Sequence, residues 1–247
     1  MPPTATFDAT ALLYVLSQPG PNLPLSEFQT WYDTDHAPLR ASVPGVLTTR
    51  RYKSLSAQKP EWLAVYELSS PAVLQCPEYI AQWKNASKYE TELLNRYETL
   101  DRRVYTLYSR KTRADYAEKQ KEGEEAKKKR VFHTVGLQPK EGGGMTDEEF
   151  ERWYEEEHIG LLSAVPGWLR STRWKLQDVK GANMKEIDTA NIPRFLAIHE
   201  WEDDSFLKTV EMKKATSTEW RTKVMDRIDG VAEERRHWGL WKEFDCS

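Results

Sequence analysis

Residues 27–53 read EFQTWYDTDHAPLRASVPGVLTTRRYK, and residues 149–175 read EFERWYEEEHIGLLSAVPGWLRSTRWK. Aligned without a gap, the two stretches are identical at 12 of 27 positions. The match resumes further along the chain, where residues 63–67 (LAVYE) correspond to residues 196–200 (LAIHE). An internal repeat of this length predicts two copies of one structural unit, each burying surface that it cannot bury alone.

Each copy is predicted to contain four strands and two helices in the order β-α-β-β-α-β, which is the ferredoxin-like unit. Short apolar runs that end in turn residues indicate the strands, and a long polar stretch indicates the second helix. In the first copy the strands are expected at 10–17, 46–54, 61–68 and 103–109, with the second helix at 77–100. In the second copy they are expected at 131–138, 168–176, 194–201 and 236–242, with the second helix at 204–230.

The first helix of each copy has local signals at both ends. Ser26 in the first copy and Thr146 in the second stand three residues before a Gln or Glu, which is the spacing of a capping box. The sequence Val-Pro-Gly follows at 43–45 and 165–167. We expect it to end both helices, because proline interrupts the helical hydrogen bonds and glycine adopts the turn.

The fold class that follows is α+β, with two tandem ferredoxin-like repeats that form one intramolecular barrel. A ferredoxin-like sheet is covered by helices on one face only, so two sheets in one chain can bury their bare faces together. The repeats are expected at 1–110 and 131–247. Residues 111–130, of which 13 of 20 are charged with mixed signs, are expected to be a solvated linker or surface helix. Because fusion already satisfies the interface between the halves, we expect a monomer, with a homodimer as the alternative.

The composition excludes several classes of protein. The chain has 247 residues, and its 36 basic and 39 acidic side chains give a net charge of -3, without the basic excess typical of nucleic-acid-binding proteins. No apolar run is long enough to cross a membrane, and the first residues do not have the pattern of a secretory signal. The two cysteines form neither a zinc pattern nor a disulfide framework. We therefore expect a cytoplasmic protein with no nucleic-acid or membrane partner.

Two matching segments resemble the signature of EthD-like proteins. They are Trp31-Tyr32-x-x-Asp35-His36-Ala37-Pro38-Leu39 followed by Val43-Pro44-Gly45, and Trp153-Tyr154-x-x-Glu157-His158-Ile159 followed by Val165-Pro166-Gly167. The EthD-like family belongs to the dimeric α+β barrel superfamily, so the resemblance implies a barrel that binds a small molecule, here as a fused dimer. The second copy departs from the pattern at Gly160, where the family has proline, so the two sites are not expected to be equivalent.

His36 and His158 are the first candidates for catalysis. Each is expected at the end of the first helix of its copy, and a histidine can move protons near neutral pH without any cofactor. Tyr32 and Tyr154 precede them by four residues, so the phenol and the imidazole are expected to face the same space. The open alternatives are that each histidine caps its helix and that each tyrosine packs in the core.

The third strand of each copy has an aromatic face and an aliphatic face, because successive side chains alternate across a strand. The aromatic face carries Trp62, Ala64, Tyr66 and Leu68 in the first copy and Phe195, Ala197, His199 and Trp201 in the second. We expect this face to line the barrel cavity, where Tyr66 and Trp201 contact the substrate, and the aliphatic face to pack under the helices.

Two histidines occur in the second copy only. His199 stands where the first copy has Tyr66, and His133 stands on the first strand where the first copy has Leu13. We therefore expect the second copy to carry the chemistry, with His133 and His199 in catalytic roles. Two core histidines with satisfied hydrogen bonds are the open alternative.

Arg51 and Arg173 occupy matching positions on the second strand of each copy. A guanidinium in the cavity would bind an enolate, a phenolate or a carboxylate, whereas a surface position is the alternative. Residues 155–158 (EEEH) are rich in metal ligands, but a helix distributes them around its axis rather than toward one point. No phosphate-binding glycine loop is present. We expect neither a metal nor a cofactor.

These residues and the resemblance favour a cofactor-independent enzyme that acts by proton transfer. The reaction would be a cyclisation, dehydration, isomerisation or decarboxylation of a flat, apolar, phenolic or polyketide-like molecule. One alternative is a cofactor-free oxygenase, in which a deprotonated substrate itself reacts with oxygen. The other is a barrel that binds a small ligand, as in a stress response, without turnover.

Overall fold

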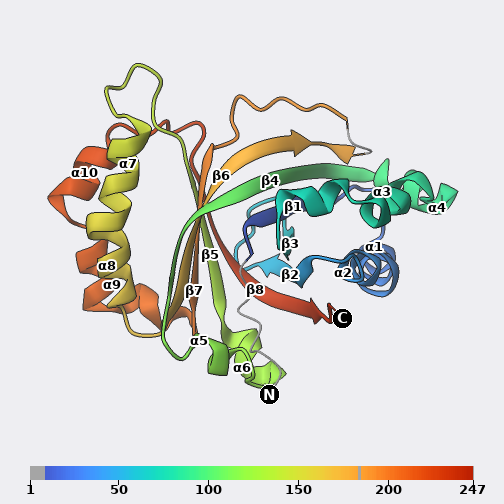
Figure 1. Ribbon diagram of the computed structural model, residues 1–247, viewed down its shortest axis with the longest axis horizontal. Helices are drawn as coiled ribbons and strands as arrows, with labels where there is room; N and C mark the ends of the chain where they lie inside the picture. Colours follow the sequence, from blue (N-terminus) through green and yellow to red (C-terminus); the bar gives the residue numbers. More distant parts are fainter. Residues whose placement is uncertain (1–8, 183–184, 247) are drawn as a thin grey trace. The chain divides into compact units, whose positions relative to one another are not determined.

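The computed structural model describes residues 9–182 and 185–246, which fall into two compact units (Figure 1). Unit 1 comprises Met1–Tyr108, Leu176–Ile187 and Trp241–Ser247, and unit 2 comprises Ser109–Lys175 and Asp188–Leu240. The predicted halves therefore differ from the units. Residues 111–130 belong to unit 2, and two segments of the second half, including the ends of its two longest strands, belong to unit 1.

In unit 1 the strands pair antiparallel in the order β4-β1-β3-β2. These strands are β1 (Ala11–Pro19), β2 (Val46–Ser54), β3 (Trp62–Leu68) and β4 (Tyr97–Thr112). The helical segments are α1 (Leu25–Trp31), η1 (Tyr32–His36), α2 (Ala37–Ala41), η2 (Pro71–Gln75), α3 (Pro77–Lys84) and α4 (Lys88–Leu94).

In unit 2 the strands pair antiparallel in the equivalent order β8-β5-β7-β6. These strands are β5 (Val131–Leu137), β6 (Trp168–Lys180), β7 (Phe195–Trp201) and β8 (Glu234–Phe244). The helical segments are α5 (Tyr116–Lys119), α6 (Glu124–Lys129), α7 (Asp147–Trp153), η3 (Tyr154–His158), α8 (Ile159–Ser163), η5 (Asp204–Lys208), α9 (Val210–Ala215) and α10 (Glu219–Met225). Helices α7–α10 lie together along one side of strands β5–β7 in Figure 1.

The strand order of the whole chain is that of a closed barrel, β1-β3-β2-β8-β5-β7-β6-β4. The expected α+β class and barrel are thereby confirmed. Residues 111–130 are the end of β4 followed by the short helices α5 and α6, in keeping with the expected surface segment.

The predicted second helix of each copy is wrong as a single element. The stretch expected at 77–100 is α3 and α4, and β4 already begins at Tyr97. The stretch expected at 204–230 is η5, α9 and α10. New helices begin at Ser87 and Thr218, whose side-chain oxygens accept hydrogen bonds from backbone N–H groups three residues on. Such capping residues in a polar stretch end one helix and begin another.

The first helix of each unit contains a turn of π-helix, which the sequence pattern does not predict. This turn is η1 in unit 1 and η3 in unit 2, and it ends at His36 and His158. Both helices then continue through α2 and α8, so the expectation that these histidines end their helices is wrong. The helix termination at Val-Pro-Gly is confirmed, because Gly45 and Gly167 adopt φ values of 91° and 79°.

The N-terminal caps of these helices match only one of the two expectations. Thr146 caps α7 as predicted, since its side chain accepts the N–H of Glu149 at 3.1 Å. Ser26 does not cap α1, because that helix begins at Leu25 after Pro24.

The face assignment of the third strand is also wrong. In unit 1 the aromatic face of β3 joins one hydrophobic cluster with Phe28, Trp31 and Tyr32 of the first helix. In unit 2, Trp201 of β7 likewise clusters with Leu162 of α8 and with Phe206. The aromatic faces therefore lie under the helices. All seven residues of β3 and of β7 are buried, so side-chain alternation carries no signal of which face is which.

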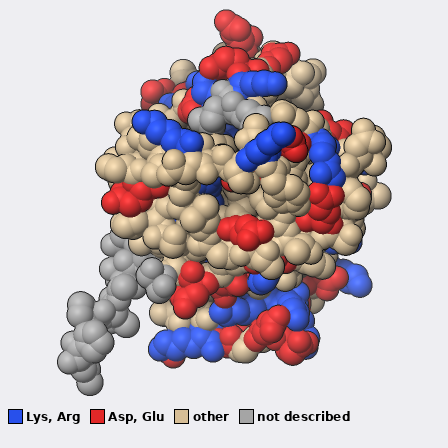
Figure 2. Space-filling model, turned by 90° about the vertical axis from the view of Figure 1, so that its right-hand side faces the viewer, with Lys and Arg blue, Asp and Glu red and all other residues tan. Residues whose placement is uncertain are grey.

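On the face shown in Figure 2, Lys and Arg side chains are interspersed with Asp and Glu, and uncharged residues fill most of the centre. This face therefore presents no continuous patch of one charge sign. Within the described ranges, no helix is both long enough and apolar enough to span a lipid bilayer.

The glycines that end the two first helices provide a matched test of packing. A Cβ added at Gly45 would lie 2.6 Å from Cγ2 of Val73, whereas at Gly167 the nearest atom would be 3.7 Å away. Both positions have positive φ, so alanine is strained at each. We expect Gly45→Ala to lower the free energy of unfolding by about 1–3 kcal/mol more than Gly167→Ala, because only the former overpacks its site. Urea denaturation of both variants measures this, and equal losses would contradict the packing argument.

Candidate functional site

Each unit has a pocket between its helices and its sheet, at equivalent positions in the two copies. The pocket of unit 1 has a volume of about 30 Å³, and that of unit 2 has a volume of about 50 Å³. Matching residues of the two copies line both, including Trp31 and Trp153, Tyr32 and Tyr154, and His36 and His158. These volumes hold a few water-sized groups.

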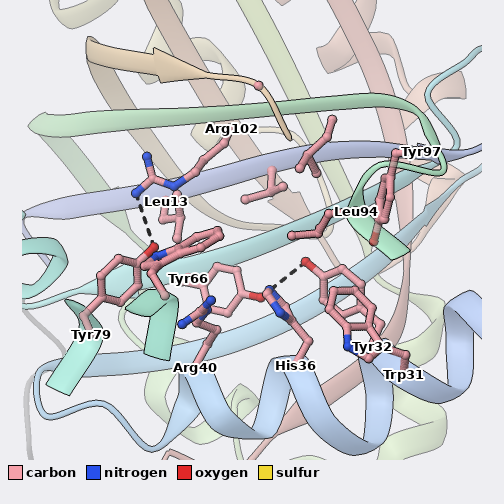
Figure 3. A pocket seen from close by; sticks show the side chains of 14 residues that line it. Leu13, Trp31, Tyr32, His36, Arg40, Tyr66, Tyr79, Leu94, Tyr97 and Arg102 are labelled. Carbon is pink, nitrogen blue, oxygen red and sulfur yellow. Dashed lines mark hydrogen bonds between the residues drawn. The ribbon is translucent and has the colours of Figure 1, made fainter. Parts of the chain in front are cut away.

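His36 is oriented by a carboxylate in the pocket of unit 1 (Figure 3). Its Nδ1 lies 3.3 Å from Oε1 of Glu90, which comes from α4. The hydrogen bond from His36 lowers the pKa of Glu90, so the carboxyl is ionised and must accept the bond. Nδ1 of a neutral His36 therefore carries the proton, and Nε2 has the free lone pair. Burial lowers the pKa of His36 to about 4.

The π-helical turn is what places this imidazole under the helix. Two residues that lie five apart on an α-helix point about 140° away from each other. The ring centroids of Trp31 and His36 are nevertheless only 4.6 Å apart, and the corresponding pair in unit 2, Trp153 and His158, is stacked at 4.5 Å. A π-helical turn, whose hydrogen bonds join residues five apart, allows this alignment.

Two predicted tyrosines meet in the same pocket. The hydroxyl oxygens of Tyr32 and Tyr66 are 3.3 Å apart, and the rings of Tyr32 and His36 are 5.0 Å apart (Figure 3). Burial raises the pKa of both phenols, so both are protonated at neutral pH and can donate hydrogen bonds. The expectation that phenol and imidazole face the same space is therefore met in unit 1.

Arg51 and Arg173 do not line either pocket, contrary to one reading of the sequence. Arg51 is 1% exposed, forms an ion pair with Asp33, and lies 4.1 Å from the centre of the Tyr32 ring. Arg173 repeats this arrangement over Tyr154 at 4.0 Å. Each guanidinium therefore supports a tyrosine from behind and is not itself placed to bind a ligand in these pockets.

Sequence reasoning missed three further residues of the unit 1 pocket. Arg40 lies over the rings of Tyr79 and Trp83, at 5.2 and 4.6 Å from their centres. Arg102 donates a hydrogen bond from Nη2 to the hydroxyl of Tyr79 at 3.3 Å. Figure 3 shows Tyr79 between the two arginines. Arg40 lies within the quoted motif, but the second copy has Leu162 at that position, so comparing the copies did not point to it.

The pocket of unit 2 is built around a row of histidines on neighbouring strands. His133 pairs in register with His199 of β7 and with His237 of β8. Their ring centroids lie 6.1 and 4.2 Å from that of His133. The equivalent row in unit 1 is Tyr66, Leu13 and Val104. His237 was missed because the last strand was not compared residue by residue between the copies.

Every histidine of unit 2 is kept neutral by burial. Burial lowers the pKa of His158 and of His199 to about 3, and it also lowers the pKa of His133 and His237. His199 Nδ1 lies 2.8 Å from Oγ of Ser171, a residue of β6. Within the described part of the chain, His133 Nε2, His237 Nε2 and His158 Nδ1 are buried without a hydrogen-bond partner.

The remaining predicted residues of unit 2 are core side chains around this row. Trp201 is fully buried and stacks on Phe206, with their ring centroids 4.2 Å apart. Tyr154 lines the pocket beside His158, with their rings 5.3 Å apart. His158 is 8% exposed, which places it inside the protein and not at the mouth of a cavity.

The argument that assigned the chemistry to the second copy is therefore wrong in its premise. It required His133 and His199 to lie on the barrel side of the sheet, whereas both line the pocket beneath the helices. Only His36 among the candidate histidines has a carboxylate partner. Among the described residues, no three His, Cys, Asp or Glu side chains are grouped closely enough to hold a metal ion.

No known family and no curated protein matches this chain significantly in sequence. Among solved structures, it is similar to an anthrone oxidase-like protein, with a TM-score of 0.63 and 11% identity over 97% of this chain and 94% of the other. It is also similar to candidate monooxygenases from Fusobacterium nucleatum (TM-score 0.57, 12% identity, 96% and 94% coverage) and Lactobacillus acidophilus (TM-score 0.55, 9% identity, 96% and 97% coverage). These likenesses show a shared fold, that of the dimeric α+β barrel superfamily.

The neutral histidines predict that the protein loses stability in acid. A histidine has a pKa near 6.5 in an unfolded chain. Because the folded pKa of His199 is lower, only the unfolded chain takes up its proton between these values. Its contribution to stability is therefore complete above about pH 6.5 and is lost as the pH falls, at about 1.4 kcal/mol per pH unit.

We expect His199→Phe to reduce the slope of unfolding free energy against pH between pH 6 and 4.5 by about that amount. Tyr66→Phe is the control, because it changes the equivalent position of unit 1 without removing a group that titrates in this range. Chemical denaturation at several pH values gives the slopes. If the His199→Phe slope equals that of the unaltered protein, His199 is not held neutral in the folded state.

Proposed function

We propose that this protein is a cofactor-independent enzyme that acts by proton transfer, with the pocket of unit 1 as its active site. The substrate would be a flat, mainly apolar, phenolic or polyketide-like molecule. The observation that carries the proposal is the hydrogen bond from His36 to Glu90 inside a pocket lined by aromatic rings. A carboxylate that fixes one ring nitrogen of a histidine leaves the other as a directed base.

In this proposal Nε2 of His36 removes a proton from an acidic C–H or O–H group of the substrate. The products of the step are an imidazolium and a substrate anion. Tyr66 and Tyr32 keep their hydroxyl protons and are placed to donate to the oxygen on which that negative charge collects. Glu90 stabilises the imidazolium, because it already accepts a hydrogen bond from Nδ1.

The low pKa of His36 constrains this step. A base with a pKa near 4 accepts a proton readily only if the anion that it creates stays beside it. The imidazolium and the enolate or phenolate would therefore remain as an ion pair until the proton is returned at another atom. This favours isomerisation, cyclisation or dehydration, in which one group removes and returns a proton.

The pocket must open to accept a ring system. Its volume of about 30 Å³ accommodates only a few atoms, and large side chains such as Trp31, Tyr97 and Leu100 line it. We propose that movement of side chains in this lining accompanies substrate binding.

Anthrone, a flat tricyclic ketone with an acidic methylene group, is a suitable probe for proton removal. We expect the protein to accelerate exchange of that methylene with D₂O under anaerobic conditions, followed by NMR. His36→Asn should lower the enzymatic rate by about 10²–10⁴-fold. Glu90→Gln should lower it less and move the acid limb of kcat/KM, near pH 4 in the unaltered protein, to lower pH, since Glu90 raises the pKa of His36.

His158→Asn is the matched control, because it changes the equivalent histidine in the other pocket. Equal losses in His36→Asn and His158→Asn would contradict the assignment of the active site to unit 1. If anthrone binds to the unaltered protein without any exchange, the alternative of a ligand-binding barrel without turnover is favoured.

A cofactor-free oxygenase is the second candidate, favoured by the fold shared with an anthrone oxidase-like protein and with candidate monooxygenases. It would begin with the same proton removal, after which the substrate anion reacts with oxygen. Oxidation of anthrone to anthraquinone consumes one O₂ per anthrone and releases one water. An oxygen electrode with anthrone in air should then show enzymatic consumption that His36→Asn abolishes. Methylene exchange without any enzymatic oxygen uptake would leave the proton-transfer enzyme as the function.

We also propose that the two units derive from one EthD-like ancestor by duplication and fusion of ferredoxin-like halves. The support is the 12 of 27 identical positions in the repeated segment and the same order of strand pairing, β4-β1-β3-β2 and β8-β5-β7-β6. The monomeric state and the cytoplasmic location remain predictions.

A further inference from the structure

We infer that the pocket of unit 1 binds a monocarboxylate, whose carboxylate group is held by Arg40 and Arg102. This inference names a substrate class for the pocket and rests in that respect on the proposed function. Its evidence is the set of buried hydrogen-bond donors in the lining, which does not include His36.

The two guanidinium groups are buried and come from separate elements. The side chain of Arg40, on α2, is 3% exposed, and that of Arg102, on β4, is 7% exposed. Tyr79 lies between them, since Arg40 covers its ring and Arg102 bonds to its hydroxyl (Figure 3). A buried arginine that lacks a close counter-ion is costly, so a pair of them in one lining requires an explanation.

Both guanidinium groups have nitrogens left without an acceptor. Arg40 donates to Oε1 of Gln82, but its Nη2 has no hydrogen-bond partner among residues 9–182 and 185–246. The same holds for Nε of Arg102, and for Nε1 of Trp83 in the same lining. These three atoms are donors that cannot accept, so the group that satisfies them must supply acceptors. A carboxylate is such a group, and arginine binds it with charge-assisted hydrogen bonds.

The charges around the pocket are incompletely balanced. None of the described residues that line it is acidic. The nearest recorded carboxylate for Arg40 is Glu90 at 4.0 Å, and Glu90 also accepts the hydrogen bond of His36. Arg102 lies 4.0 Å from Asp178, which is 45% exposed and also 3.5 Å from Lys180. Both acids are therefore distant and shared, which leaves room for one further negative charge.

The rest of the lining determines what the carboxylate is attached to. It consists of aromatic and aliphatic side chains, among them Leu13, Val15, Trp31 and Leu94. The cavity of about 30 Å³ has space for a group the size of a carboxylate, with the apolar body of the ligand lying among these side chains once they move. The class that results is an apolar or aromatic monocarboxylic acid.

Isothermal titration of the full-length protein with benzoate and with benzamide tests this inference. The two probes have the same shape, but only benzoate has acceptor oxygens alone and a negative charge. We expect benzoate to bind about 10–100-fold more tightly than benzamide at constant ionic strength. This comparison uses the unaltered protein, so it does not depend on any variant folding. Equal affinities, or displacement of benzoate by an equal concentration of chloride, would overturn the inference.

Variants locate the binding site. Arg40→Gln and Arg102→Gln should each weaken benzoate binding by about 10–100-fold and leave benzamide binding unchanged. Arg235→Gln is the matched control, because Arg235 lines the pocket of unit 2 at the position that corresponds to Arg102. Loss of benzoate binding in Arg235→Gln alone would place the site in unit 2 and contradict the assignment. Binding is measured without turnover, so a catalytic role for His36 can fail while carboxylate binding holds, and the reverse.

Discussion

The stacking of a tryptophan on a histidine five residues further along the first helix is the contact on which both pockets depend. An unbroken α-helix would direct Trp31 and His36 to different sides, and only the π-helical turn η1 brings their rings to 4.6 Å. With the imidazole held beneath the helix, its Nδ1 faces Glu90 of α4 and its ring borders Tyr32. The same turn holds His158 against Trp153 in unit 2. One local irregularity of the backbone thus sets the chemistry of each cavity.

The two pockets share this frame but differ in what surrounds the histidine. Across the sheet of unit 1 the row beside the pocket is Val104, Leu13 and Tyr66, whereas in unit 2 the three matching positions are all histidine. Unit 1 adds two buried guanidinium groups and a carboxylate that orients its histidine, so its lining is polarised. The lining of unit 2 relies on neutral imidazoles, three of which have a buried nitrogen without a partner in the described part of the chain. Positions on neighbouring strands have changed together, as is expected when they border one space.

Much of the fold follows from local sequence, because local rules dictate it. The alternation of apolar runs, the Val-Pro-Gly terminators and the cap at Thr146 each act within a few residues and are readable directly. The long second helices were misread because Ser87 and Thr218 are ordinary polar residues on a polar helix and become caps only in the folded backbone. The orientation of β3 was misread because both of its faces are buried. Its aromatic residues gave no indication of whether helices or strands cover them.

The site was less predictable than the fold because its partners come from distant parts of the chain. His36, Tyr32 and Tyr66 were selected from the sequence, and all three line one pocket. Glu90, which orients His36, is 54 residues away and lies on a segment without a motif. Arg40 and Arg102 are brought together through Tyr79, and no periodicity joins these three positions. Such residues are found only when a tertiary structure places them around one cavity.

The π-helical turn also separates two kinds of sequence change that an ordinary helix treats alike. A helix with an i to i+5 hydrogen bond contains one residue more than the α-helical turn that it replaces. Removing a single residue from 32–35 would let α1 continue into α2 as one regular helix and would rotate everything after the deletion by about 100°. Secondary structure content would hardly change, yet His36 would turn away from Trp31 and Glu90. In this chain the spacing of residues along the first helix therefore matters as much as their identity.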